Sequence, residues 1–152
     1  MSDRISKDDY FLEIALTVSK RSTCLRRHYG CVIVNNNEII ATGYNGSARG
    51  EVNCVERGSC PRMYAPHNSG DYSTCCSVHA EQNAMLTAAR RDMIGATMYL
   101  AGEERILRDN VDGYEKWVGI KDCSPCPICV RMIANSGVER VVNHEGIVWE
   151  RS

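Results

Sequence analysis

The sequence contains no long apolar run. Its first residues, MSDRISKDDYF, include no stretch of signal-peptide length, and no later segment approaches the roughly eighteen apolar residues that span a membrane. It has no internal repeat and no low-complexity tract, and its 152 residues suit one core better than two. We therefore expect a soluble, cytoplasmic protein with no membrane partner and a single domain over residues 1–152.

An excess of charge of one sign is also missing. The chain has 18 Lys and Arg against 19 Asp and Glu, a net charge of −1, and the two signs are interspersed. A protein that holds a long nucleic acid by its phosphates needs a basic stripe. The composition therefore favours a small-molecule ligand.

Cysteine, by contrast, is abundant. Thiols stay reduced in the cytosol, so metal sites are the leading explanation for nine cysteines. A secreted disulfide framework is the alternative, but the odd count and the missing signal peptide argue against it. The cysteines are Cys24, Cys31, Cys54, Cys60, Cys75, Cys76, Cys123, Cys126 and Cys129.

The spacing of apolar residues predicts the secondary structure. Ser6 is typical of a helix N-cap, and the residues after it predict a helix to about Arg21. Three asparagines at 35–37 predict a hairpin turn. The other predicted elements are a helix over 78–91, a strand over 97–100, a helix from about Pro125 to Gly137, and strands over 138–142 and 147–149. This order predicts an α/β sandwich with helices on the faces of a sheet.

Two motifs far apart in the chain match the signature of zinc-dependent deaminases, H-x-E with P-C-x-x-C. They are His79-Ala80-Glu81 and Pro125-Cys126-Pro127-Ile128-Cys129. A catalytic zinc takes three protein ligands and leaves one position open for water, and one imidazole with two thiolates is an established set. The motifs therefore predict a zinc site made of His79, Cys126 and Cys129.

Glu81 is predicted to carry protons, because a fourth protein ligand would close the site to water. Residues two apart on a helix point in nearly opposite directions, so His79 and Glu81 share a site only if His79 lies at the frayed first turn. Cys123-Ser124-Pro125-Cys126 is a second possible C-x-x-C. Proline suits a helix entry, so Pro125 favours Cys126 and Cys129 as the ligands and leaves Cys123 a bystander.

Further segments extend the match along the chain. They are RSTC at 21–24, GCVIV at 30–34, ATGYNGS at 41–47, Asn53-Cys54 and HAEQNA at 79–84. In this order they resemble the deoxycytidylate (dCMP) deaminase branch of the cytidine deaminase superfamily. The resemblance implies a three-layer α/β/α sandwich of the cytidine deaminase type with a mixed central sheet. It also implies hydrolysis of dCMP to dUMP and ammonia, which supplies dTMP synthesis.

The resemblance also implies substrate contacts. Asn45 matches the asparagine that hydrogen-bonds the sugar hydroxyl, although an asparagine here is also a common turn residue. A monophosphate needs a cation, and Arg26 or Arg27 is the candidate, although a charged run is often a solvated face. Family enzymes are often oligomers regulated by dCTP and dTTP, so a dimer or hexamer with these effectors is expected.

Some family members carry a second, structural zinc, and two of its ligand positions match Cys24 and Cys54. Cys60 and Cys75 complete the predicted set, with Cys76 or His67 as possible substitutes. Four thiols would fix the aperiodic segment 43–77 to the end of the first helix. Cys31, within an apolar strand, is predicted to be a core residue.

The segment 102–122 departs from the family pattern, in which the preceding strand runs almost directly into P-C-x-x-C. Its Tyr114 and Trp117 suggest a lid over the base or a contact with a neighbouring subunit, and a solvated loop is the third alternative.

Two other functions remain open. One is deamination of a free nucleoside or of a nucleic-acid base, and the near-neutral charge argues against the nucleic acid. The other is a non-catalytic binding module in which every zinc ligand is structural.

Overall fold

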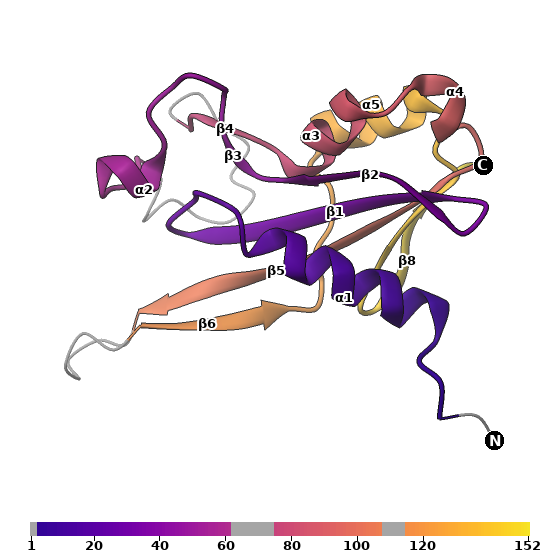
Figure 1. Ribbon diagram of the computed structural model, residues 1–152, viewed down its shortest axis with the longest axis horizontal. Coiled ribbons are helices and arrows are strands. Elements are labelled where there is room, and N and C mark those ends of the chain that lie inside the picture. Colours follow the sequence, from indigo (N-terminus) through magenta and orange to yellow (C-terminus); the bar gives the residue numbers. More distant parts are fainter. Residues whose placement is uncertain (1–2, 62–74, 108–114) are drawn as a thin grey trace.

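A computed structural model describes residues 3–61, 75–107 and 115–152, which form a six-stranded mixed sheet between two layers of helices (Figure 1). One face is covered by α1 (Lys7–Ser19). The other is covered by α3 (Ala80–Thr87), α4 (Arg90–Met93) and α5 (Pro127–Ser136). The predicted α/β/α sandwich is confirmed. No helix in these ranges has the length and apolar character needed to cross a membrane.

The strands run in the order β2-β1-β5-β7-β8. They are β1 (Arg27–Asn35), β2 (Glu38–Tyr44), β5 (Thr97–Leu107), β7 (Arg140–Asn143) and β8 (Gly146–Glu150). The sheet is mixed because β7 is parallel to β5, whereas the other pairs are antiparallel. Two short strands, β3 (Gly46–Ser47) and β4 (Ser77–Val78), form a separate pair, and α2 (Cys54–Arg57) lies between them in the chain.

The predicted first helix and hairpin are both present. Ser6 caps α1, since its Oγ accepts a hydrogen bond of 3.1 Å from the backbone N of Asp9. The turn between β1 and β2 places Asn36 and Asn37 at φ 52° and 65°. Asparagine tolerates this left-handed region, and two such residues match the twist of a hairpin.

The helix predicted over 78–91 is interrupted. It divides into α3 and α4, because Ala88 and Ala89 are extended, with ψ of 151° and 140°. Alanine favours a helix locally, so tertiary packing decides the break. Ala88 packs on the core beneath α3, and Met93 of α4 is buried in the same core.

Two glycines let the helices lie directly on the strands. A Cβ at Gly30 of β1 would collide with the backbone of Ala15 in α1. A Cβ at Gly43 of β2 would collide with the backbone of Ala80 and Ala84 in α3. Gly43 thus fixes the height of α3, and of the residues at its start, above the sheet.

The segment 102–122 is not a loop in its described part. β5 continues to Leu107 and pairs with β6 (Glu115–Ile120), so residues 102–107 and 115–120 form a two-stranded arm that extends from the sheet (Figure 1). The ring of Trp117 stacks on that of His28, with centroids 3.6 Å apart and planes 13° apart. This stacking and the strand pairing hold the arm in an ordered conformation. The periodicity of the sequence did not predict these two strands. Tyr114 lies outside the described residues.

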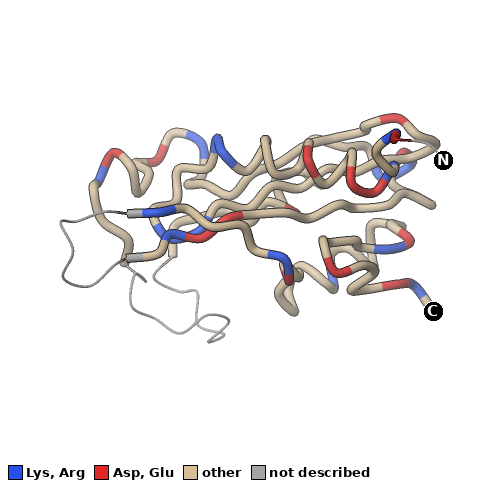
Figure 2. The backbone as a smooth tube through the Cα atoms, turned by 90° about the horizontal axis from the view of Figure 1, so that it is seen from below, with Lys and Arg blue, Asp and Glu red and all other residues tan. Residues whose placement is uncertain are grey.

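Charged residues of both signs are interspersed along the described backbone, as Figure 2 shows. This arrangement agrees with the interspersed charges of the sequence.

Candidate active site

The two predicted motifs lie at the starts of two neighbouring helices. His79 is the N-cap of α3 and has extended backbone angles, and Cys126 is the N-cap of α5. The side chain of Gln82 accepts a hydrogen bond of 2.9 Å from the backbone N of His79. His79 therefore lies just outside the regular helix, as the shared site with Glu81 requires.

His79, Cys126 and Cys129 are brought together. Nδ1 of His79 lies 3.5 Å from Sγ of Cys126 and 3.4 Å from Sγ of Cys129. A tetrahedral zinc, with Zn–N of about 2.0 Å and Zn–S of about 2.3 Å, separates such atoms by about 3.5 Å. Within the described ranges this is the only group of three or more candidate ligands whose ligand atoms all lie within 4.8 Å of one another. The donor set and its spacing fit zinc.

The electrostatic environment of His79, Cys126 and Cys129 also favours a bound cation. Burial, followed by the charge of the Glu81 carboxylate, raises the pKa of the Cys129 thiol. A buried thiol of this kind needs a metal ion beside it to ionise. Burial likewise raises the pKa of Glu81, whose side chain is only 5% exposed. A carboxyl group with a raised pKa is suited to taking up and releasing a proton.

Cys123 lies outside the ligand group. Its Sγ is 3.5 Å from the carbonyl O of Ile120, and burial raises the pKa of this thiol to about 12. The buried side chain of Asn143 donates a hydrogen bond of 2.7 Å to the carbonyl O of Cys123. The structure thus favours the register that uses Cys126 and Cys129, with Asn143 holding the segment that leads to them.

A pocket opens beside the group and contains the predicted substrate residues. Besides His79, Glu81 and Cys126, the residues that line it include Arg26, Arg27, Tyr29, Asn45, Leu100 and Ser124. Residues from β1, the end of β2 and the starts of α3 and α5 therefore share one cavity.

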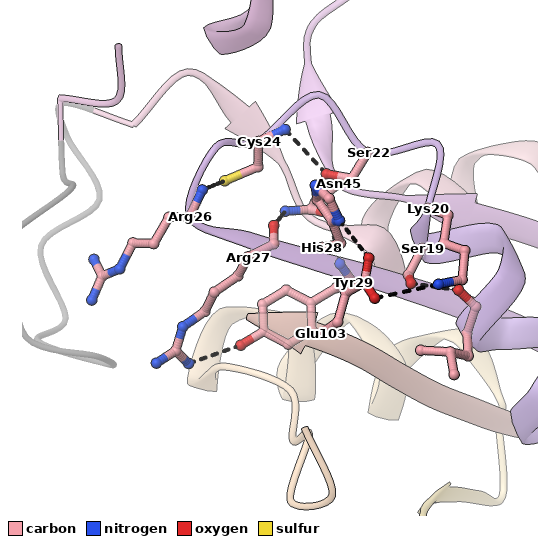
Figure 3. Close-up of polar contacts among 11 residues, drawn as sticks. Ser19, Lys20, Ser22, Cys24, Arg26, Arg27, His28, Tyr29, Asn45 and Glu103 are labelled. Carbon is pink, nitrogen blue, oxygen red and sulfur yellow. Dashed lines mark hydrogen bonds and ion pairs between the residues drawn. The ribbon is translucent and has the colours of Figure 1, made fainter. Parts of the chain in front are cut away.

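Asn45 continues the pairing of β1 and β2 after β2 ends. Its Oδ1 accepts a hydrogen bond of 2.8 Å from the backbone N of Tyr29, and its Nδ2 donates one of 3.0 Å to the carbonyl O of Arg27 (Figure 3). An asparagine side chain has two donor hydrogens and two acceptor lone pairs. These two bonds therefore leave capacity for a ligand.

The two predicted arginines lie at the start of β1. The guanidinium of Arg27 donates a hydrogen bond of 3.1 Å to the hydroxyl of Tyr29 (Figure 3). It also lies 3.1 Å from the carboxylate of Glu104 on β5. The backbone N of Arg26 donates to Sγ of Cys24 at 3.4 Å. Arg26 and Arg27 are both placed to bring positive charge to the pocket.

The cysteines predicted for a second zinc lie in one region but do not form a ligand group within the described ranges. Sγ of Cys54 is 3.8 Å from Sγ of Cys76, and Ser47 Oγ is 3.2 Å from the same Cys76 sulfur. Cys24 and Cys75 line the pocket instead. Burial raises the pKa of Cys24, and the neighbouring thiols of Cys60 and Cys75 contribute further to the rise. His67 lies outside the described residues, and Cys31 is fully buried in the core, as predicted.

Sequence reasoning missed Tyr29 and Glu104. No motif contains them, and Glu104 lies in the segment 102–122, for which a solvated loop was only one of three alternatives. The alternation of side chains along β1 was the available signal, because it places Arg27 and Tyr29 on one face.

Two relatives illustrate the similarity of the chain to known enzymes. It is 39% identical over 142 residues to a deoxycytidylate deaminase of Schizosaccharomyces pombe. The matched region covers 93% of this chain and 38% of that protein. It is 38% identical over 141 residues to a deoxycytidylate deaminase of Mycobacterium phage D29. The matched region covers 89% of this chain and 91% of that protein. The chain therefore spans well under half of the yeast relative and nearly all of the phage relative.

The fold has a solved counterpart in the dCMP deaminase of the cyanophage S-TIM5 in apo form. The TM-score is 0.59 at 26% identity, with 93% of this chain and 83% of that chain covered. The family model for the cytidine and deoxycytidylate deaminase zinc-binding region matches residues 5–145. The chain, with its paired helix starts and its histidine-and-cysteine group, belongs to the cytidine and deoxycytidylate deaminase family.

Proposed function

We propose that the protein is a zinc-dependent dCMP deaminase that hydrolyses dCMP to dUMP and ammonia. The observation that carries this proposal is the pocket in which His79, Cys126 and Glu81 meet two arginines. Relatives named deoxycytidylate deaminase support the same reaction.

The residues have distinct roles. His79, Cys126 and Cys129 would hold the zinc, which would supply a water molecule that ionises near neutral pH. Glu81 accepts the proton of the attacking water and passes it to the ring nitrogen beside the attacked carbon. Glu81 then carries the second proton of the added water to the amino group, which leaves as ammonia. Burial of Glu81 keeps bulk water away from these transfers.

The rest of the pocket binds the nucleotide. Asn45 hydrogen-bonds the sugar hydroxyl through the donor and acceptor that its β1 contacts leave over. Arg26 and Arg27 bind the phosphate by charge-assisted hydrogen bonds.

A substrate panel tests the proposal against the other deaminase functions. Ammonia release is measured from dCMP, deoxycytidine, CMP and a short single-stranded DNA. The proposal expects dCMP to be the preferred substrate. Activity confined to deoxycytidine would refute the nucleotide assignment, and activity on the DNA alone would indicate a nucleic-acid deaminase.

A second, structural zinc is proposed near α2. The Cys54–Cys76 separation of 3.8 Å matches the distance of about 3.8 Å between two sulfurs on one tetrahedral zinc, which supports Cys76 as a ligand beside Cys54. Cys24, Cys60 and Cys75 are the candidates for the remaining positions. The test is the zinc content per chain: Cys54→Ser and Cys76→Ser should each lower it from two to one. Two zincs in both variants would refute this site.

Cytoplasmic location, self-association and nucleotide regulation are proposed as well. None of the nine cysteines, all within the described ranges, forms a disulfide, which suits a reducing compartment. Apolar side chains are exposed on α3 and α5, namely Leu86, Ile128 and Met132, and support a homo-oligomer such as a dimer or hexamer. Sedimentation with and without dCTP or dTTP, together with activity under the same conditions, tests both the assembly and the effectors. A monomer that neither nucleotide affects would refute both.

A further inference from the structure

We propose that Tyr29 is a substrate-binding residue whose hydroxyl donates a hydrogen bond to the phosphate of the nucleotide, and that Arg27 and Glu104 position it. This inference rests on the proposed dCMP deaminase activity and adds a specificity-determining contact to it.

The arm makes room for the Tyr29 ring in the pocket wall. Tyr29 on β1 is paired directly with Gly102, the first residue of the arm on β5. A Cβ at Gly102 would lie 2.9 Å from Cδ1 of Tyr29, closer than side-chain atoms approach each other. The glycine therefore allows the ring to lie against β5, and in this place it lines the pocket.

The arm also fixes the hydroxyl. Arg27 lies two residues before Tyr29, on the same side of β1, and is paired directly with Glu104. The Glu104 carboxylate lies 3.1 Å from the guanidinium of Arg27. The same guanidinium donates to the Tyr29 hydroxyl at 3.1 Å (Figure 3). A chain of two polar contacts thus runs from the arm to the phenol.

The hydroxyl keeps its own proton for a ligand. A tyrosine hydroxyl is one donor as well as an acceptor, and Arg27 uses it only as an acceptor. Within residues 3–61, 75–107 and 115–152 no acceptor receives the Tyr29 proton. Because Tyr29 lines the pocket, this donor is available to a bound molecule.

A phosphate is the acceptor that the surroundings favour. Arg26 and Arg27 line the same pocket and attract an anion. Burial raises the pKa of Tyr29 to about 12, so the phenol stays neutral and remains a donor at physiological pH. A neutral donor beside a guanidinium matches a phosphate, whose oxygens accept from both.

Tyr29→Phe tests the contact, with Tyr99→Phe as the matched control. Tyr99 is likewise on a strand, but it is buried and its hydroxyl donates a hydrogen bond of 2.7 Å to Asp8 of α1, away from the pocket. KM and kcat are measured for dCMP and deoxycytidine. Tyr29→Phe should raise the KM for dCMP by about tenfold to a hundredfold and leave kcat and the KM for deoxycytidine nearly unchanged. Tyr99→Phe should leave both KM values unchanged.

Two changes at Glu104 test the positioning role. Glu104→Ala removes the partner that holds Arg27, so the KM for dCMP should rise roughly twofold to fivefold. Glu104→Gln keeps a hydrogen-bond acceptor for Arg27, so the KM for dCMP should stay close to the wild-type value. An equal loss in both variants, or a change in the KM for deoxycytidine, would overturn the role of Glu104.

Other outcomes overturn the phosphate contact. Equal changes for dCMP and deoxycytidine in Tyr29→Phe would place the hydroxyl on the sugar or base, and no change would make Tyr29 structural. If the wild-type protein does not deaminate dCMP, the proposed function fails. Calorimetry with dUMP then decides the inference by itself, because weaker binding by Tyr29→Phe supports the contact and equal binding overturns it.

Discussion

Nδ1 of His79 lies 3.4 Å from Sγ of Cys129, although 50 positions separate the two residues in the chain. Two helix starts on one face of the sheet produce this contact. The zinc content should therefore depend on both motifs. Cys129→Ser should lose one zinc per chain and nearly all deaminase activity, because the softer thiolate is replaced by a poor ligand.

Cys123→Ala is the control for that variant. It removes a buried thiol from the same neighbourhood but not from the ligand group. Plasma emission spectrometry of the purified proteins measures zinc per chain, and ammonia release measures activity. Equal zinc loss in the two variants would show that packing, and not ligation, explains the effect.

Glu81→Gln should separate metal binding from catalysis. Glutamine has nearly the same shape as glutamate but does not shuttle the proton, so activity should fall by at least about a hundredfold. The fold and the zinc content should stay unchanged, because Glu81 is not among the ligands. Activity and metal content are measured together, with the exposed Glu38→Gln as a control. Wild-type activity in Glu81→Gln would favour a non-catalytic zinc module.

The sequence predicted the grouping of His79, Cys126 and Cys129 better than it predicted the helices and strands around it. His79, Cys126 and Cys129 were predictable because zinc chemistry requires these residue types near helix starts. The break at Ala88 and Ala89 was not, since alanine favours a helix and only packing against the core overrides it.

The arm shows a second limit of sequence reasoning. Residues 102–107 and 115–120 alternate too weakly to indicate strands, and their order comes from pairing and from the Trp117–His28 stack. The Trp117–His28 stack joins residues far apart in the chain, so local patterns do not reveal it. The pairing of Arg27 with Glu104, on which the Tyr29 inference depends, was hidden for the same reason.

Gly43→Ala should destabilise the fold at the point where α3 meets the sheet. A methyl group at Gly43 collides with the α3 backbone, which has little room to shift, and overpacking of this kind costs about 1–3 kcal/mol. Urea unfolding measures the change in free energy. The control is Gly119→Ala on β6, where a Cβ would meet nothing within 4 Å. If the two variants unfold at the same urea concentration, the prediction that α3 packs too closely on β2 to admit a side chain at position 43 is wrong.

Asn45→Ala should affect both stability and substrate binding, whereas Asn143→Ala should affect stability alone. Each asparagine is buried and makes two hydrogen bonds to the backbone, but only Asn45 lines the pocket. Unbonded backbone groups should cost each variant about 1–3 kcal/mol of unfolding free energy. Loss of a sugar contact should also raise the KM for dCMP and for deoxycytidine by about tenfold in Asn45→Ala. Urea titration and initial rates measure the two effects, and equal KM values in the two variants would leave Asn45 with only the strand-end role that its β1 contacts explain.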